Sequence, residues 1–101
     1  MAELEHEIET YMGRELRAMG CLWYKFVSPG ARGVPDRILC LPNGRVVFVE
    51  LKTETGVLSA LQARQIELLR SRGQAVVVVR GIDGARDFIS LVRREAGGRR
   101  R

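Results

Sequence analysis

The stretch from Gly33 to Lys52 constrains the fold most, because its pattern predicts a β-hairpin whose second strand ends in charged residues. Residues 46–49 are apolar without interruption, which predicts a central strand covered on both faces. Glu50 and Lys52 follow two residues apart, so they point to the same face of that strand. Charges at the end of a covered strand are unfavourable unless they are paired or bound to a metal ion.

The turn between the two strands decides whether Asp36 joins this pair. A two-residue turn would place Asp36 opposite Leu51, on the other face, and would put a proline where a backbone N–H is needed. A three-residue loop over 42–44, Pro-Asn-Gly, fits better, as a type I turn followed by glycine in the left-handed bulge position. In that register Asp36 lies opposite Glu50 and shares a face with Lys52.

Two neighbouring carboxylates form a hard, oxygen-rich site of the kind that Mg²⁺ or Mn²⁺ prefers. The Leu51 carbonyl is a further candidate ligand. The Lys52 ammonium could orient a water molecule or stabilise a phosphate oxygen. We do not expect Lys52 to be a free general base, because Asp36 and Glu50 should hold its proton. The alternative is a surface hairpin end with an ordinary Glu–Lys ion pair.

The composition indicates what kind of protein carries this hairpin. At 101 residues it is one domain with a modest core, and 46% hydrophobic residues predict a globular fold. The net charge of +5 and pI near 10.0 suit a polyanionic partner. No apolar run is long enough to span a membrane, and the acidic start excludes a signal peptide. Cys21 and Cys40 lack metal-ligand spacing, which favours reduced, buried thiols in a cytoplasmic protein.

Four blocks of sequence are more specific than the carboxylate spacing alone. They are YKFVSPG at 24–30, GVPDR at 33–37, VELK at 49–52 and SALQ at 59–62. Asp36 followed by Glu50-Leu51-Lys52 has the spacing of a PD-(D/E)xK nuclease, and the ordered blocks resemble the VRR-NUC family in its small stand-alone form from phages and bacteria. The resemblance covers nearly the whole chain. It implies a metal-dependent DNA phosphodiesterase with a restriction-endonuclease-like core, whose small members resemble Holliday-junction resolvases and pair as homodimers.

The resemblance also implies roles outside the hairpin. The family supplies a glutamate from its first helix, which makes Glu5 the candidate third carboxylate and Glu9 the second choice. Acidic residues near a helix start also interact favourably with the helix dipole, which explains them without any metal. The family's glutamine beside the metal matches Gln62, although Ser59-x-x-Gln62 is equally a capping box. His6 has no partner at ligand spacing and is expected at the surface.

The candidate DNA contacts are Lys25, Ser28, Arg32 and Arg37. The resemblance places Lys25 near the scissile phosphate, and a solvated strand edge is the alternative. The loop at 28–34 lacks the Gly-Lys-Ser/Thr of a phosphate-binding Walker motif. Its N–H groups and Arg32 could contact a DNA backbone, or the loop could be a plain connector.

The expected order of elements is helix, three strands, helix, strand, helix. Helices are predicted over 3–18, 59–72 and 84–96, and strands over 21–27, 36–41, 46–52 and 75–79, by hydrophobic periodicity and glycine stops. The three consecutive strands form a meander and the middle helix adds the fourth in parallel, giving an α/β fold with a mixed sheet. The domain should span 1–97, with a flexible basic tail at 98–101.

Several core positions follow from the same periodicities. One of Trp23 and Tyr24 should be buried, since they face opposite sides of a strand. The inward positions of the two later helices are Leu61, Leu68 and Leu69, then Phe88, Ile89 and Val92.

These features predict a structure-selective, metal-dependent DNA endonuclease that forms a homodimer on branched DNA. The alternatives are a non-catalytic basic module that binds nucleic acid, and a nuclease that acts on other DNA structures or on RNA.

Overall fold

The computed structural model describes residues 5–98, and its elements follow the predicted order. They are α1 (Glu5–Ala18), β1 (Leu22–Lys25), β2 (Arg37–Cys40), β3 (Val46–Lys52), α2 (Ala60–Ser71), β4 (Ala75–Arg80) and α3 (Gly81–Gly98). The sheet order is β1-β2-β3-β4. Strands β1 to β3 pair antiparallel, and β4 joins β3 in parallel after α2. The predicted mixed α/β sheet is confirmed.

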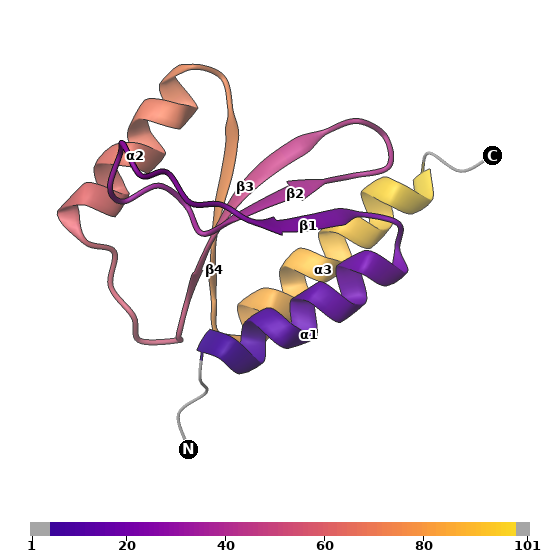
Figure 1. The fold of residues 1–101 in the computed structure, drawn as a ribbon. Coiled ribbons are helices and arrows are strands. Elements are labelled where there is room, and N and C mark those ends of the chain that lie inside the picture. The colour runs from indigo at the N-terminus through magenta and orange to yellow at the C-terminus, as the bar shows by residue number, and fades with distance from the viewer. Residues whose placement is uncertain (1–4, 99–101) are drawn as a thin grey trace.

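The helices form a layer on each side of the sheet. Figure 1 shows α1 and α3 side by side on one side, with α2 on the other. The main core lies between the sheet and the α1–α3 pair, where Val47, Val49 and Leu51 of β3 are buried. The residues that α1 and α3 bury there are Ile8, Met12, Leu16, Phe88, Ile89 and Val92. Of the two aromatic residues on β1, Trp23 is buried and Tyr24 is exposed, which confirms that one of them belongs to the core.

The hairpin register is the one that a three-residue loop predicts. Arg37 pairs with Val49 across β2 and β3, and the Leu41 N–H donates to the Arg45 carbonyl over 2.8 Å. Gly44 has a φ of 93° and donates its N–H to the Leu41 carbonyl over 3.0 Å. The loop therefore spans residues 42–44, and Glu50 lies on the strand face that the three-residue loop predicts.

The hairpin loop is also tied to the helix layer. The Asn43 amide donates to Glu95 of α3 over 3.0 Å, while its carbonyl oxygen accepts the Arg45 N–H over 2.9 Å. Arg45 in turn forms an ion pair with Glu95 at 3.0 Å. These contacts fix the loop at the end of the hairpin away from Asp36 and Glu50.

The long connection between β1 and β2 reaches α2, as Figure 1 shows. At the contact, Gly33 has a φ of +86°, and a Cβ there would lie 2.7 Å from the Leu61 carbonyl carbon. Glycine is required at this position for two reasons, because it permits positive φ and leaves room for the helix backbone. The connection is therefore packed tightly against the start of α2.

The structure differs from the sequence expectations in the bounds of two elements, β1 and α3. Strand β1 is shorter than predicted, because residues 26 and 27 leave the ladder where the connection turns toward α2. Helix α3 begins at Gly81, directly after β4, rather than near Gly84. It extends through Gly98, so the predicted tail from 98 begins inside the helix, and residues 99–101 lie outside the described residues.

The predicted inward face of α2 was partly wrong. Leu61 is 50% exposed, Leu68 and Leu69 are half-buried, and the fully buried residue is Ile66. Helix α2 covers mainly β4, so only a narrow stripe of the helix becomes buried. None of the helices within residues 5–98 is long and apolar enough to cross a membrane.

The two loop glycines should respond differently to substitution. We expect Gly33→Ala to lower the free energy of unfolding by at least about 2 kcal/mol, because it combines a strained φ with a clash against backbone. Gly44→Ala should cost only about 1 kcal/mol, because its φ of +93° is equally strained but its Cβ would meet nothing within 4 Å. Chemical denaturation of both variants measures the difference. Equal losses would contradict the packing of Gly33 against α2.

Candidate active site

Glu50 lies near the end of β3 and is only 1% exposed. Its Oε2 accepts a hydrogen bond of 2.9 Å from Gln62 Nε2 and lies 3.8 Å from the Lys52 ammonium nitrogen. Its Oε1 is buried and has no hydrogen-bond partner among the described residues. A buried carboxylate with an unsatisfied oxygen is costly, so such a group calls for a functional explanation.

Asp36 is held beside Glu50 by the backbone of two other strands. Its carboxylate accepts the Leu51 N–H over 3.0 Å, and its carbonyl accepts the Phe26 N–H over 2.7 Å. Asp36 is therefore fixed between the ends of β1 and β3, directly before β2 begins. The structure brings Asp36, Glu50 and Lys52 together at one end of the hairpin.

Burial and, to a lesser extent, the neighbouring Asp36 carboxylate raise the pKa of Glu50 to about 7, against an opposing effect of Lys52. The protein holds this side chain where its charged form is unfavourable. A divalent cation would reverse that balance, because it favours the ionised carboxylate. A pKa near neutrality in a site of this kind is a recognised mark of function.

Gln62 performs two tasks with its two amide atoms. Its Oε1 accepts the Ser59 N–H over 2.8 Å, while its own N–H donates to the Ser59 hydroxyl over 3.1 Å, which completes the predicted capping box of α2. Its Nε2 donates to Glu50. The predicted capping box is therefore present, and the same side chain joins the start of α2 to the buried carboxylate.

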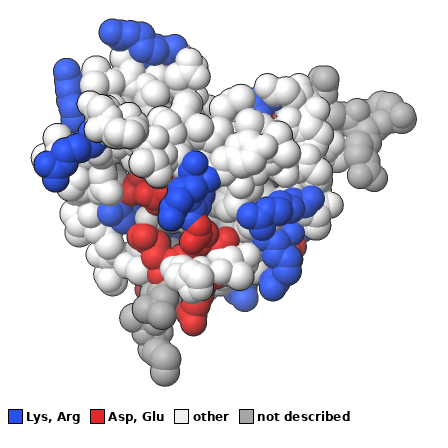
Figure 2. All heavy atoms as spheres, viewed as in Figure 1, with Lys and Arg blue, Asp and Glu red and all other residues white. Residues whose placement is uncertain are grey.

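A hollow of about 400 Å³ opens on the α1 side of this sheet end. It is lined by Asp36, by Glu5 and Glu9 from the first turns of α1, and by Lys25 at the end of β1. Figure 2 shows acidic side chains gathered on this face of the molecule with Lys and Arg side chains beside them. The hollow therefore combines carboxylates with nearby cations, which suits a site for a metal ion and a phosphate.

The two glutamates of α1 are placed differently. Glu9 forms an ion pair with the guanidinium of Arg37, whereas Glu5 is exposed on the hollow and acts electrostatically on both Glu50 and Arg37. His6 is exposed, as predicted. Both glutamates line the hollow, but only Glu9 is engaged in an ion pair among the described residues.

The predicted DNA contacts divide into two groups. Lys25 and Arg32 are exposed and Ser28 is half-buried in the connecting loop. Arg37 is only 5% exposed, so it offers DNA little surface, although it lines the hollow. The alternation of the strand turns its side chain to the face under α1.

The residues present fit a divalent metal ion with two protein carboxylates. Asp36 and Glu50 supply hard oxygens, and Glu50 Oε1 lacks a partner. Within residues 5–98, no three His, Cys, Asp or Glu side chains form a group that could hold a metal. Glu5 therefore does not join the other two carboxylates in this structure, and further ligands would come from the Leu51 carbonyl, water or substrate.

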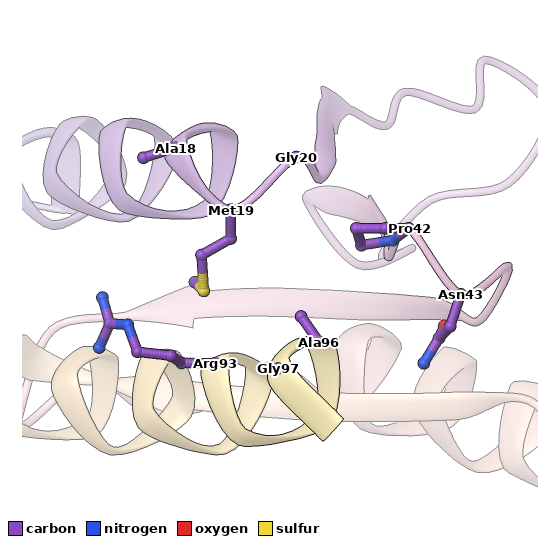
Figure 3. A pocket seen from close by; sticks show the side chains of 8 residues that line it. All are labelled: Ala18, Met19, Gly20, Pro42, Asn43, Arg93, Ala96 and Gly97. Atoms are coloured by element: carbon purple, nitrogen blue, oxygen red, sulfur yellow. The ribbon is translucent and has the colours of Figure 1, made fainter. Parts of the chain in front are cut away.

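A larger hollow lies at the other end of the helices, as Figure 3 shows. It measures about 700 Å³ and lies between the last residues of α1, the hairpin loop and the C-terminal turn of α3. Its walls include Met19, Pro42 and Ala96, with Arg93 and Asn43 as polar residues. It holds neither of the paired carboxylates, whereas the smaller hollow is lined by Asp36.

A mixed sheet with two carboxylates and a lysine at one end of its central hairpin defines a class of nuclease-like folds. Comparisons agree with this class. Residues 11–83 match the family model described as the VRR-NUC domain. The chain belongs to the VRR-NUC family, which places it among nucleases.

Individual relatives give the same result. The chain is 44% identical over 75 residues, which is 74% of this chain and 81% of the relative, to "Putative nuclease p44" of Acyrthosiphon pisum secondary endosymbiont phage 1. A solved VRR-NUC domain matches with a TM-score of 0.80 and 32% identity, covering 85% of this chain and 94% of that one. A second solved VRR-NUC domain protein has a TM-score of 0.71 at 20% identity, covers 93% and 91%, and supports the fold alone.

The raised pKa of Glu50 predicts how stability depends on pH. Because the folded pKa of about 7 lies above the ordinary value of 4.5, neutral Glu50 favours the metal-free fold below about pH 4.5, and this contribution is lost as pH rises through 7. Metal-free Glu50→Gln should therefore exceed wild type in unfolding free energy at pH 8, by about 3 kcal/mol, and match it near pH 4.5. Urea denaturation in EDTA at both pH values tests this. A pH-independent difference would contradict the shifted pKa.

Proposed function

We propose that this nuclease is a Mg²⁺- or Mn²⁺-dependent endonuclease that cleaves branched DNA, in the manner of a Holliday-junction resolvase. The observation that carries the metal requirement is the buried Glu50 carboxylate beside Asp36, with one oxygen that has no hydrogen-bond partner. An ionised acid in this environment needs a cation nearby, and Lys52 at 3.8 Å is too distant for a close hydrogen-bonded pair.

Asp36, Glu50 and the Leu51 carbonyl would hold the metal, with Glu5 as a further carboxylate that reaches it through movement of its side chain or through water. A bound Mg²⁺ or Mn²⁺ would act as a Lewis acid toward the phosphate and lower the pKa of the attacking water. Lys52 would orient that water or stabilise negative charge on the phosphate as it develops. Gln62 would keep Glu50 oriented through the 2.9 Å hydrogen bond that it donates.

The DNA backbone would lie across the hollow and the β1–β2 connection. Lys25 lines the hollow with Asp36, and Arg32 is exposed on the connection near Ser28. The net charge of +5 favours association with a polyanion at low salt. Tight packing of Gly33 against Leu61 would keep this connection in place relative to the carboxylates.

Removal of one carboxylate should abolish cleavage while the fold is retained. Asp36→Asn keeps the hydrogen bond from the Leu51 N–H but removes the charge, so we expect at least a 100-fold loss of turnover on labelled DNA in Mg²⁺ or Mn²⁺. Lys52→Ala is the companion variant, with a similar loss of turnover but DNA affinity within about twofold of wild type across a salt series. Wild-type turnover by purified Asp36→Asn would refute the site.

The same assay separates the alternatives. A four-way junction, a flap, a linear duplex and single-stranded RNA are compared as substrates, each with Mg²⁺, with Mn²⁺ and with EDTA. A resolvase-like enzyme cuts the junction best and needs the metal. Preference for the flap, the duplex or RNA would support nuclease activity but refute junction specificity. Binding without cleavage would favour a non-catalytic basic module.

We further propose that the chain acts as a homodimer, because each copy carries one carboxylate pair and two coordinated nicks require two. A two-fold dimer would match the near two-fold symmetry of a four-way junction. Sedimentation equilibrium at micromolar protein should give twice the 11.4 kDa of the chain. A monomer that stays monomeric on junction DNA would favour an enzyme that makes single nicks.

A further inference from the structure

Arg37 is a charged residue that the fold buries almost completely. It begins β2, lies opposite Val49 and Lys25 in the sheet, and is 5% exposed. Its guanidinium forms an ion pair with Glu9 of α1, and its Nη1 makes a long contact of 3.4 Å with the Asp36 carbonyl. One side chain thus touches both the first turns of α1 and the residue that supplies a site carboxylate.

The burial of Arg37 makes its partner obligatory. Its Nε has no hydrogen-bond partner among the described residues, so Glu9 is the main compensation for a charge removed from water. Burial lowers the pKa of Arg37 and the Glu5 carboxylate opposes that change. Breaking a buried ion pair by removing one partner is strongly unfavourable, because the other charge is left uncompensated. Helix α1 is therefore held where Glu9 meets Arg37.

The position of Glu9 on α1 determines where Glu5 lies. The two residues are one helical turn apart and therefore share a face. With Glu9 fixed on Arg37, Glu5 faces the hollow that Asp36 and Leu51 also line. If the ion pair were absent, the apolar contacts of Ile8 and Met12 would still hold the helix, but no other ion pair among the described residues would join the first turns of α1 to the sheet.

We infer that Glu9 and Arg37 form an internal clamp that positions the first turn of α1 and Asp36 on opposite sides of the hollow. Both act as positioning residues, through Glu5 and Asp36, although their side chains also line the hollow. The inference rests on the proposed metal-dependent function, whose site it completes. It also assigns the two α1 glutamates separate tasks, one structural and one facing the hollow.

A second ion pair on the same helix provides a matched control. Glu15 of α1 pairs with Arg93 of α3 at 3.3 Å, and Arg93 is more than half exposed. This pair joins α1 to its neighbouring helix, far along the chain from Asp36. Glu15→Gln therefore removes the same charge from the same helix without touching the clamp, and exposed ion pairs contribute little to stability.

The test compares Glu9→Gln, the double variant Glu9→Leu with Arg37→Met, and Glu15→Gln. Three quantities are measured: Mn²⁺ affinity by electron paramagnetic resonance, hydrogen exchange of the amides at residues 9–12, which donate to the carbonyls of the first turn of α1, and kcat and KM on junction DNA. The double variant replaces the pair with shorter apolar side chains and leaves no unpaired charge, so we expect it to fold even if Glu9→Gln alone unfolds.

For the double variant we expect about tenfold weaker Mn²⁺ binding, at least tenfold faster exchange at residues 9–12, and kcat reduced at least tenfold with KM within threefold. Glu15→Gln should match wild type in all three measurements. A folded double variant with wild-type Mn²⁺ affinity and wild-type kcat would overturn the inference, since the pair would then serve packing alone.

Failure of the proposed function would look different. If the wild-type chain bound no Mn²⁺ and cleaved no DNA, the metal site would be refuted, and the exchange data would still report whether the pair holds α1. Exchange at residues 9–12 equal to wild type in the folded double variant would overturn the clamp whatever the activity.

Discussion

The burial of the Glu50 carboxylate is the interaction on which the arrangement of this molecule depends. A single carboxylate is kept at 1% exposure at the end of an otherwise apolar strand, and each neighbouring element supplies part of its environment. Helix α2 contributes the Gln62 amide, the segment before β2 contributes Asp36, and β3 itself contributes Lys52. Desolvation of a charge on this scale is tolerated in proteins mainly where function requires it.

The site lies where the two helical layers meet at the end of the sheet. Gln62 approaches from the layer of α2, whereas Glu5 and Glu9 approach from the layer of α1. Asp36 stands between them because its carboxylate accepts a backbone N–H from β3. Neither layer alone forms the site, so its geometry depends on how both helices are attached to the sheet.

Much of this arrangement could be predicted from local sequence. The Pro-Asn-Gly loop determined the register that brings Asp36 beside Glu50, and the Ser59–Gln62 spacing predicted the capping box. These features depend on a few adjacent residues, whose geometry turn and cap chemistry restrict closely. The Gln62–Glu50 hydrogen bond required, in addition, the resemblance to a known family.

The features that the sequence did not predict all depend on contacts between distant elements. The burial of Arg37 follows from which face of β2 lies under α1, and its partner Glu9 is 28 positions away in the chain. Leu61 is exposed because α2 covers little beyond β4, a property of the helix angle rather than of its own periodicity. The early start of α3 overrides the glycines at 81 and 84, which local propensity would place outside a helix.

The three-residue hairpin loop has a consequence for how such a chain can diverge. Surface loops usually accept insertions and deletions, since they carry little of the core. Here one added or deleted residue between β2 and β3 would shift the pairing by one position and turn Asp36 away from Glu50. The contacts of Asn43 and Arg45 with Glu95 would resist a compensating slip of the strand register. Loop length should therefore be as invariant among functional descendants of this chain as the carboxylates themselves, although the loop lies at the opposite end of the strands.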